Sequence, residues 1–189
     1  MNEKMEKWEK QQGAKFLRGI GLQLNQTVLD FGCRVGHYTI PAAKIVGNKG
    51  FVYAIDTQDN ALAELEQKRH IQKLTNVRII KTFGQLNLPL EDKSIDVVLF
   101  YDVLHYLKAA ERKKLYREAF RVLRQNGLLS VYPKHILEDN PIMEFQNMDM
   151  ENIKREIQDS NFVFSKRYCG LISHDDGLNQ GCVLNFIKH

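Results

Sequence analysis

The chain has 189 residues, of which 43% are hydrophobic and 26% are charged, and its formal net charge is +4. These values suit one globular domain with a buried core. They exclude a membrane-spanning chain, because no apolar run approaches the roughly 18 residues that a span needs.

The charged N-terminus, Met1 to Lys10, lacks the apolar region of a signal peptide, so we expect a cytoplasmic protein. The three cysteines, Cys33, Cys169 and Cys182, are widely spaced and odd in number. They predict neither a disulfide framework nor a zinc site, and no metal is expected.

The predicted elements begin with a helix over residues 2–19, anchored by Trp8, Phe16 and Leu17, within an N-terminal helical segment over 1–25. Further helices are expected at 36–46, 59–73, 109–124 and 149–160, the last ending at a left-handed Asn161, and strands at 27–31, 51–55, 77–81, 95–101 and 128–132.

This alternation predicts an α/β fold with a parallel, doubly wound sheet, in a single domain over 1–189. Two more strands are expected at 162–169 and 181–187, with only about eleven residues between them. Because a parallel crossover needs roughly a dozen or more residues, this last pair should be antiparallel. The irregular stretch 133–148 is interpreted as a substrate-side arm.

The densest basic run, Arg112-Lys113-Lys114 with Arg117, Arg121 and Arg124, falls on one of the predicted helices beside Glu111 and Glu118. We interpret it as a solvated helix face. A nucleic-acid-binding patch is the less favoured alternative.

The chain is organised around the turn that follows the strand at 27–31. Gly32 and Gly36 allow the backbone to approach a ligand closely, and the next helix points its N-terminal amides at the same place. Asp56 ends the following strand, twenty residues after Gly36, where a carboxylate can accept hydrogen bonds from a ribose diol. A dinucleotide-binding enzyme is disfavoured, because the loop does not read G-x-G-x-x-G.

Several motifs occur in order: Val28-Leu29-Asp30-Phe31-Gly32-Cys33-x-x-Gly36, Val52-Tyr53-Ala54-Ile55-Asp56, Leu88-Pro89-Leu90, Ser94-Ile95-Asp96-Val97-Val98, Val103-Leu104-His105-Tyr106-Leu107 and Arg121-Val122-Leu123-Arg124-Gln125-Asn126-Gly127. Over residues 15–189 the chain thereby resembles the class I S-adenosylmethionine-dependent methyltransferases of small molecules, such as the ubiquinone/menaquinone-biosynthesis and arsenite enzymes. The resemblance implies a Rossmann-like, seven-stranded, mostly parallel sheet with an antiparallel C-terminal hairpin. It also implies S-adenosylmethionine as cofactor and a small-molecule methyl acceptor.

The resemblance implies a set of cofactor-binding residues: Asp30, Gly32, Cys33, Arg34, Gly36, Tyr38, Asp56, Thr57, Gly84, Gln85 and Tyr101. The catalytic residue stays open. Tyr101, His105 and Tyr132 are the candidates, with Asp102 and His135 nearby in the sequence.

Two positions depart from the family pattern. Arg34 stands where relatives carry glycine, and Gly84 stands where they commonly carry an adenine-binding Asp. If φ at residue 34 is negative, the side chain reaches solvent or an acid; if φ is positive, arginine is strained and its side chain can fill the pocket. The alternative function is therefore a non-catalytic protein of this fold, a partner subunit or sensor with weakened cofactor binding.

Overall fold

The computed structural model describes residues 3–189. Asn2, with which the predicted N-terminal helix begins, lies outside the described residues. Within the described part of the chain, no helix is both long and apolar enough to cross a membrane.

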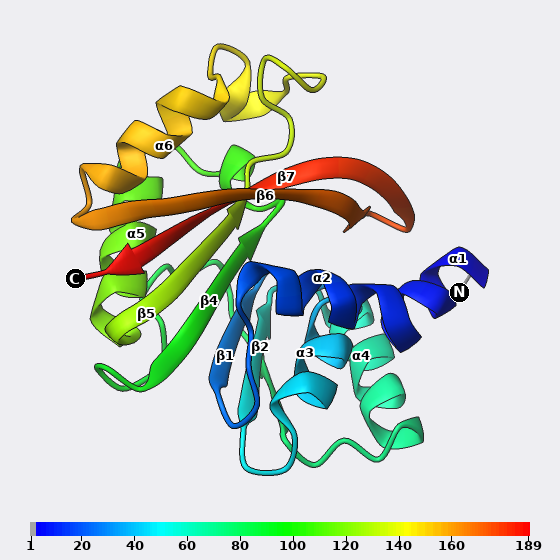
Figure 1. The fold of residues 1–189 in the computed structure, drawn as a ribbon. Helices are drawn as coiled ribbons and strands as arrows, with labels where there is room; N and C mark the ends of the chain where they lie inside the picture. The colour runs from blue at the N-terminus through cyan, green and yellow to red at the C-terminus, as the bar shows by residue number, and fades with distance from the viewer. Residues whose placement is uncertain (1–2) are drawn as a thin grey trace. The chain divides into compact units, whose positions relative to one another are not determined.

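Helices and strands alternate as the sequence predicts (Figure 1). The helical elements are α1 (Glu3–Lys7), η1 (Trp8–Gln12), α2 (Gly13–Ile20), α3 (Thr39–Val46), α4 (Asp59–Ile71), η2 (Leu104–Tyr106), α5 (Ala109–Val122), η3 (Met143–Phe145) and α6 (Met150–Gln158). The strands are β1 (Thr27–Phe31), β2 (Phe51–Asp56), β3 (Val77–Lys81), β4 (Ile95–Tyr101), β5 (Leu123–Tyr132), β6 (Phe162–His174) and β7 (Gly177–Lys188).

The seven strands form one sheet in the order β3-β2-β1-β4-β5-β7-β6. The pairs β1–β2, β2–β3 and β4–β5 are parallel, whereas β5 and β7 are antiparallel. The mostly parallel α/β fold with an antiparallel C-terminal pair is thus confirmed.

The chain divides into two compact units, which are described separately. The first comprises residues 3–84 and 169–181, and the second comprises 85–168 and 182–189. In the first unit β1 pairs with β2 from Thr27↔Phe51 to Phe31↔Ile55, which brings the ends of these strands to one edge. Helix α3 packs on both strands, and α2 packs on α3.

The N-terminal helical segment is anchored as expected, with Trp8 and Leu17 fully buried and Phe16 nearly so. It is not one regular helix, because η1 is a π-helical turn between α1 and α2. Such turns in α-helices frequently occur at functional sites. Here the turn buries Trp8 and its neighbour Glu9 together.

In the second unit, β4 is buried along nearly its whole length, as its apolar sequence predicts. Helix α6 begins after the N-cap Asp149, whose side chain accepts from the Asn152 backbone, and Asn161 takes the predicted left-handed conformation. Residues 133–148 contain η3 and otherwise irregular structure.

Several predicted boundaries are wrong. Helix α3 begins at Thr39 rather than at Gly36, and β5 begins at Leu123, where α5 was expected to continue. Asn126 and Gly127 lie inside β5, because a register shift between Ile95 and Val97 of β4 accommodates them. The connection between β6 and β7 is two residues long instead of eleven, because pairing extends both strands through a Gly-, Ser- and Asn-rich sequence.

The cysteine prediction is also wrong in part, because Cys169 and Cys182 are disulfide-bonded while Cys33 is free.

The basic run on α5 is not simply a solvated face. Arg112 is buried and makes two hydrogen bonds to Glu156, while Arg121 pairs with Glu118 and Asp92. Ion pairing of this kind neutralises part of the positive charge that a nucleic-acid patch would need.

Candidate functional site

The turn between β1 and α3 has left-handed backbone at three positions. Gly32, Arg34 and Gly36 have φ values of +79°, +44° and +85°. A Cβ at Gly36 would lie 2.3 Å from Leu65 Cδ1 on α4. Glycine at 36 is therefore required by this conformation and by packing against α4, rather than by ligand approach alone.

Asp56, at the end of β2, holds this turn together. It is 8% exposed, and one carboxylate oxygen accepts from the Arg34 backbone N–H at 2.8 Å. The other oxygen accepts from the backbone N–H groups of Thr57 and Gln58, at 2.7 and 3.0 Å. A carboxylate has about four acceptor sites, so Asp56 retains capacity for a further donor.

Asp30, at the buried end of β1, is the second acid at this edge. It is 2% exposed and accepts a 2.6 Å hydrogen bond from the Thr39 hydroxyl. Burial raises the pKa of Asp30 to about 6, and the negative charge of Asp56 acts in the same direction. Burial together with both acids also raises the pKa of the Cys33 thiol, so Cys33 stays protonated and unreactive near neutral pH.

The sequence left two outcomes open for Arg34: a negative φ with a side chain that reaches solvent or an acid, or a positive, strained φ. The structure shows one feature of each. Its φ is positive, the conformation expected to strain a non-glycine residue. Its guanidinium nevertheless reaches an acid, with Nη1 3.1 Å from Asp175 Oδ1 at the β6–β7 connection.

Buried charged side chains, which the sequence pattern did not indicate, contact the turn between β1 and α3. Glu9 is 1% exposed, and its Oε1 lies 2.7 Å from His37 Nδ1 and 2.9 Å from Lys68 Nζ. Lys68 also donates to the Val35 carbonyl, and the Trp8 indole donates to the His37 carbonyl. Although burial by itself raises the pKa of Glu9, the hydrogen bonds from His37 and Lys68 hold it below its usual value.

Gly84 follows β3 in the first unit. It is exposed, has φ +86°, and a Cβ built there would meet no atom within 4 Å. Space would therefore allow a side chain at this position, whereas the positive φ favours glycine. Gln85, which the resemblance also placed in the cofactor-binding set, is an exposed residue that begins the second unit.

The second unit carries the candidates for proton transfer. The Tyr101 hydroxyl shares a 2.8 Å hydrogen bond with Ser130. Burial raises the pKa of Tyr132 well above its ordinary value, so its phenol does not act as a base near neutral pH.

His105 is 1% exposed, and its Nδ1 lies 3.5 Å from Asp102 Oδ1. His135 Nε2 lies 3.7 Å from the same oxygen. Asp102 and His135 both have left-handed φ, +59° and +64°. Such conformations cluster at active sites, so these three residues form the best proton-transfer candidate within the second unit.

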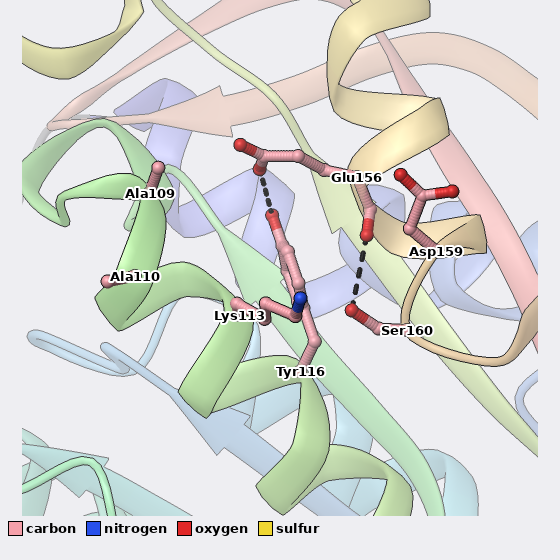
Figure 2. A pocket seen from close by; sticks show the side chains of 7 residues that line it. All are labelled: Ala109, Ala110, Lys113, Tyr116, Glu156, Asp159 and Ser160. Atoms are coloured by element: carbon pink, nitrogen blue, oxygen red, sulfur yellow. Dashed lines mark hydrogen bonds between the residues drawn. The ribbon is translucent and has the colours of Figure 1, made fainter.

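A pocket of about 260 Å³ lies between α5 and α6 in the same unit (Figure 2). Tyr116 donates to Glu156 across it, and the Ser160 hydroxyl donates to the Glu156 carbonyl. Because Glu156 is already bound by Arg112, these groups stabilise the contact between the two helices. The pocket contains none of the residues predicted to bind cofactor or to catalyse.

Comparison with known proteins identifies the family. The family described as "Methyltransferase domain" matches residues 29–131, more than half of the chain. The chain belongs to this methyltransferase family. The family predicted from the sequence is confirmed.

Curated methyltransferases resemble this one over part of their length. A demethylmenaquinone methyltransferase from Geobacillus stearothermophilus is 35% identical over 92 residues, which are 49% of this chain and 37% of that protein. A ubiquinone/menaquinone biosynthesis C-methyltransferase, UbiE, from Citrobacter koseri is 31% identical over 121 residues, 62% of this chain and 47% of that one. The chain spans about half the length, or less, of these curated relatives.

A solved structure described as a SAM-dependent methyltransferase from Aquifex aeolicus superposes with a TM-score of 0.74 at 24% identity. The match covers 96% of this chain and 92% of that one, and it supports the fold. The expectation of S-adenosylmethionine as cofactor agrees with the family match.

Proposed function

We propose that this methyltransferase-family chain transfers a methyl group from S-adenosylmethionine to a small molecule. The observation that carries the proposal is Asp56, a nearly buried carboxylate at the end of β2 that orders the glycine turn and keeps capacity to accept another hydrogen bond. A carboxylate at this place suits the vicinal hydroxyls of a ribose.

The other residues of the first unit fit the rest of the cofactor. Asp30, with its raised pKa, offers negative charge that a nearby cationic sulfonium favours. Gly32, Cys33 and Arg34 offer backbone groups, while Tyr38 and Thr57 flank the turn. The exposed, unobstructed backbone at Gly84 suits an adenine ring.

The cofactor supplies an already activated methyl group, so the protein's main task is to hold the acceptor in line with it. A base is needed only for an acceptor that must lose a proton. Tyr101 and Tyr132 are unsuited to that task, because the first is hydrogen-bonded to Ser130 and the second remains protonated. His105 or His135, beside Asp102, would accept the proton at a ring nitrogen.

For the acceptor, we propose a small molecule rather than a nucleic acid. The names of the curated relatives point to precursors of ubiquinone and menaquinone, which are the first compounds to assay. Residues 133–148 are proposed as an arm on the acceptor side.

A thermal-shift titration tests the proposal. S-adenosylhomocysteine at about 100 times its dissociation constant should stabilise the protein by about 2.7 kcal/mol, which raises the melting temperature by about 5 to 11 °C. Asp56→Ala should lose most of this shift, whereas Asp159→Asn, an exposed acid on the second unit, should keep it. No shift with the parent protein at millimolar ligand would favour the non-catalytic alternative.

A further inference from the structure

The connection between β6 and β7 lies against the cofactor turn, and both belong to the first unit. The Arg34 guanidinium lies 3.1 Å from Asp175, and the Tyr38 hydroxyl donates to the Ser173 carbonyl at 2.7 Å. These contacts join a hairpin at the end of the chain to a turn some 140 residues earlier.

A third contact places His37 between two acids. Its Nδ1 lies 2.7 Å from Glu9, and its Nε2 lies 3.6 Å from Asp176. The same turn thus contacts the N-terminal segment through Glu9 and the β6–β7 hairpin through Asp176. We call the contacts of the hairpin the clasp: Arg34 with Asp175, His37 with Asp176, and Tyr38 with Ser173.

Arg34 has a special place in the clasp because it binds two acids at once. Its backbone N–H donates to Asp56, the proposed ribose ligand, while its side chain pairs with Asp175. A displacement of the hairpin tip therefore acts directly on the residue that is hydrogen-bonded to Asp56.

Both partners of this ion pair have left-handed backbone, with φ +44° at Arg34 and +50° at Asp175. Glycine would adopt either conformation without strain. Strained conformations persist where surrounding contacts determine them, and they cluster at ligand clamps and switch regions. A charged pair at two such positions points to a function for the side chains themselves.

We propose that Arg34 is a positioning residue that fastens the β6–β7 tip to the cofactor turn, and that the clasp must open for cofactor exchange. Arginine at position 34 then does not abolish the site; its ion pair with Asp175 slows cofactor entry and release. This inference rests on the proposed function, because the exchanging ligand is the cofactor.

The test compares two variants that break the clasp with one that preserves it. Arg34→Gln and Asp175→Asn remove one charge each, whereas Arg34→Lys keeps the charge. Arg69→Gln is the matched control, because it breaks a partly exposed ion pair with Glu66 on α4, away from the clasp.

Two measurements are made on each protein: hydrogen exchange of backbone amides 170–181 without ligand, and the dissociation rate of S-adenosylhomocysteine by stopped flow. Exposed ion pairs are weak, so we expect both rates to rise about two- to fivefold in Arg34→Gln and Asp175→Asn. Arg34→Lys should restore most of the parent behaviour. About 0.5 M salt should accelerate the parent but add little to Asp175→Asn.

The proposal is overturned if Arg34→Gln leaves exchange at 170–181 unchanged, or if Arg69→Gln produces the same change. It is also overturned if exchange rises while ligand dissociation stays at the parent rate. Failure of the proposed function looks different: the parent itself would not bind S-adenosylhomocysteine, while the exchange rates would still report whether Arg34 holds the hairpin.

Discussion

Replacing Asp30 with asparagine should stabilise the protein above pH 6. Asp30 is buried, and burial raises its pKa from the ordinary 3.8 to about 6. The folded protein therefore retains a proton that the unfolded chain loses between these two pH values. The free energy of unfolding consequently falls as the pH rises through this window, and the loss is complete above pH 6.

The magnitude follows from the same pKa values. The difference between 3.8 and about 6 corresponds to a destabilisation of about 3 kcal/mol at pH 8. Asparagine carries no charge and keeps an oxygen that can accept from the Thr39 hydroxyl. We therefore expect Asp30→Asn to raise the free energy of unfolding by about 2 to 3 kcal/mol at pH 8, and to change it little at pH 3.5.

Urea unfolding followed by circular dichroism at intervals from pH 3.5 to pH 8 measures this difference. Asp159→Asn, at an exposed acid, is the control and should stay within about 0.5 kcal/mol of the parent at every pH. The reasoning is refuted if the difference between Asp30→Asn and the parent does not grow from pH 3.5 to pH 8. A stabilised variant that loses cofactor affinity would show that Asp30 is retained for binding.

Three further predictions concern the same turn. Asp56→Ala should weaken S-adenosylhomocysteine binding at least about tenfold by calorimetry, because backbone donors of the turn lose their acceptor; unchanged affinity would rule out the ribose assignment. Gly36→Ala should lower the free energy of unfolding by about 2 to 4 kcal/mol, from strain and from the 2.3 Å clash with Leu65. If the clash contributes, Gly36→Ala should cost less in a Leu65→Ala background than in the parent, although Leu65→Ala itself destabilises the core. Lys68→Met should cost about 3 kcal/mol in urea unfolding, because it leaves Glu9 buried with one charged partner fewer; combining it with Glu9→Gln should cost less than the two single changes added together.

The sequence predicted well what depends on local pattern. The unbroken apolar run at Ile95–Tyr101 is a buried strand, and the mostly parallel sheet has the antiparallel C-terminal pair that the sequence predicts. The end of the hairpin was mispredicted, because Gly177, Asn179 and Gly181 have turn-like propensities that cross-strand pairing overrides.

Only the part of the candidate site that belongs to a motif with regular spacing could be predicted from the sequence. Gly32, Gly36 and Asp56 belong to a spaced motif and lie together. Glu9 and Lys68 carry no such signal, because each resembles an ordinary helix-surface charge until its partner, far along the chain, is known. The contact of Arg34 with Asp175 likewise depends on the long β6–β7 hairpin, which no local pattern specifies.

Calorimetric titration of S-adenosylhomocysteine into the parent protein and into Asp56→Ala, side by side, tests the central claim most directly. The account predicts one site per chain in the parent and affinity reduced at least about tenfold in the variant. Absence of binding by the parent, or equal affinity in both proteins, would contradict a cofactor site built around Asp56 and the glycine turn.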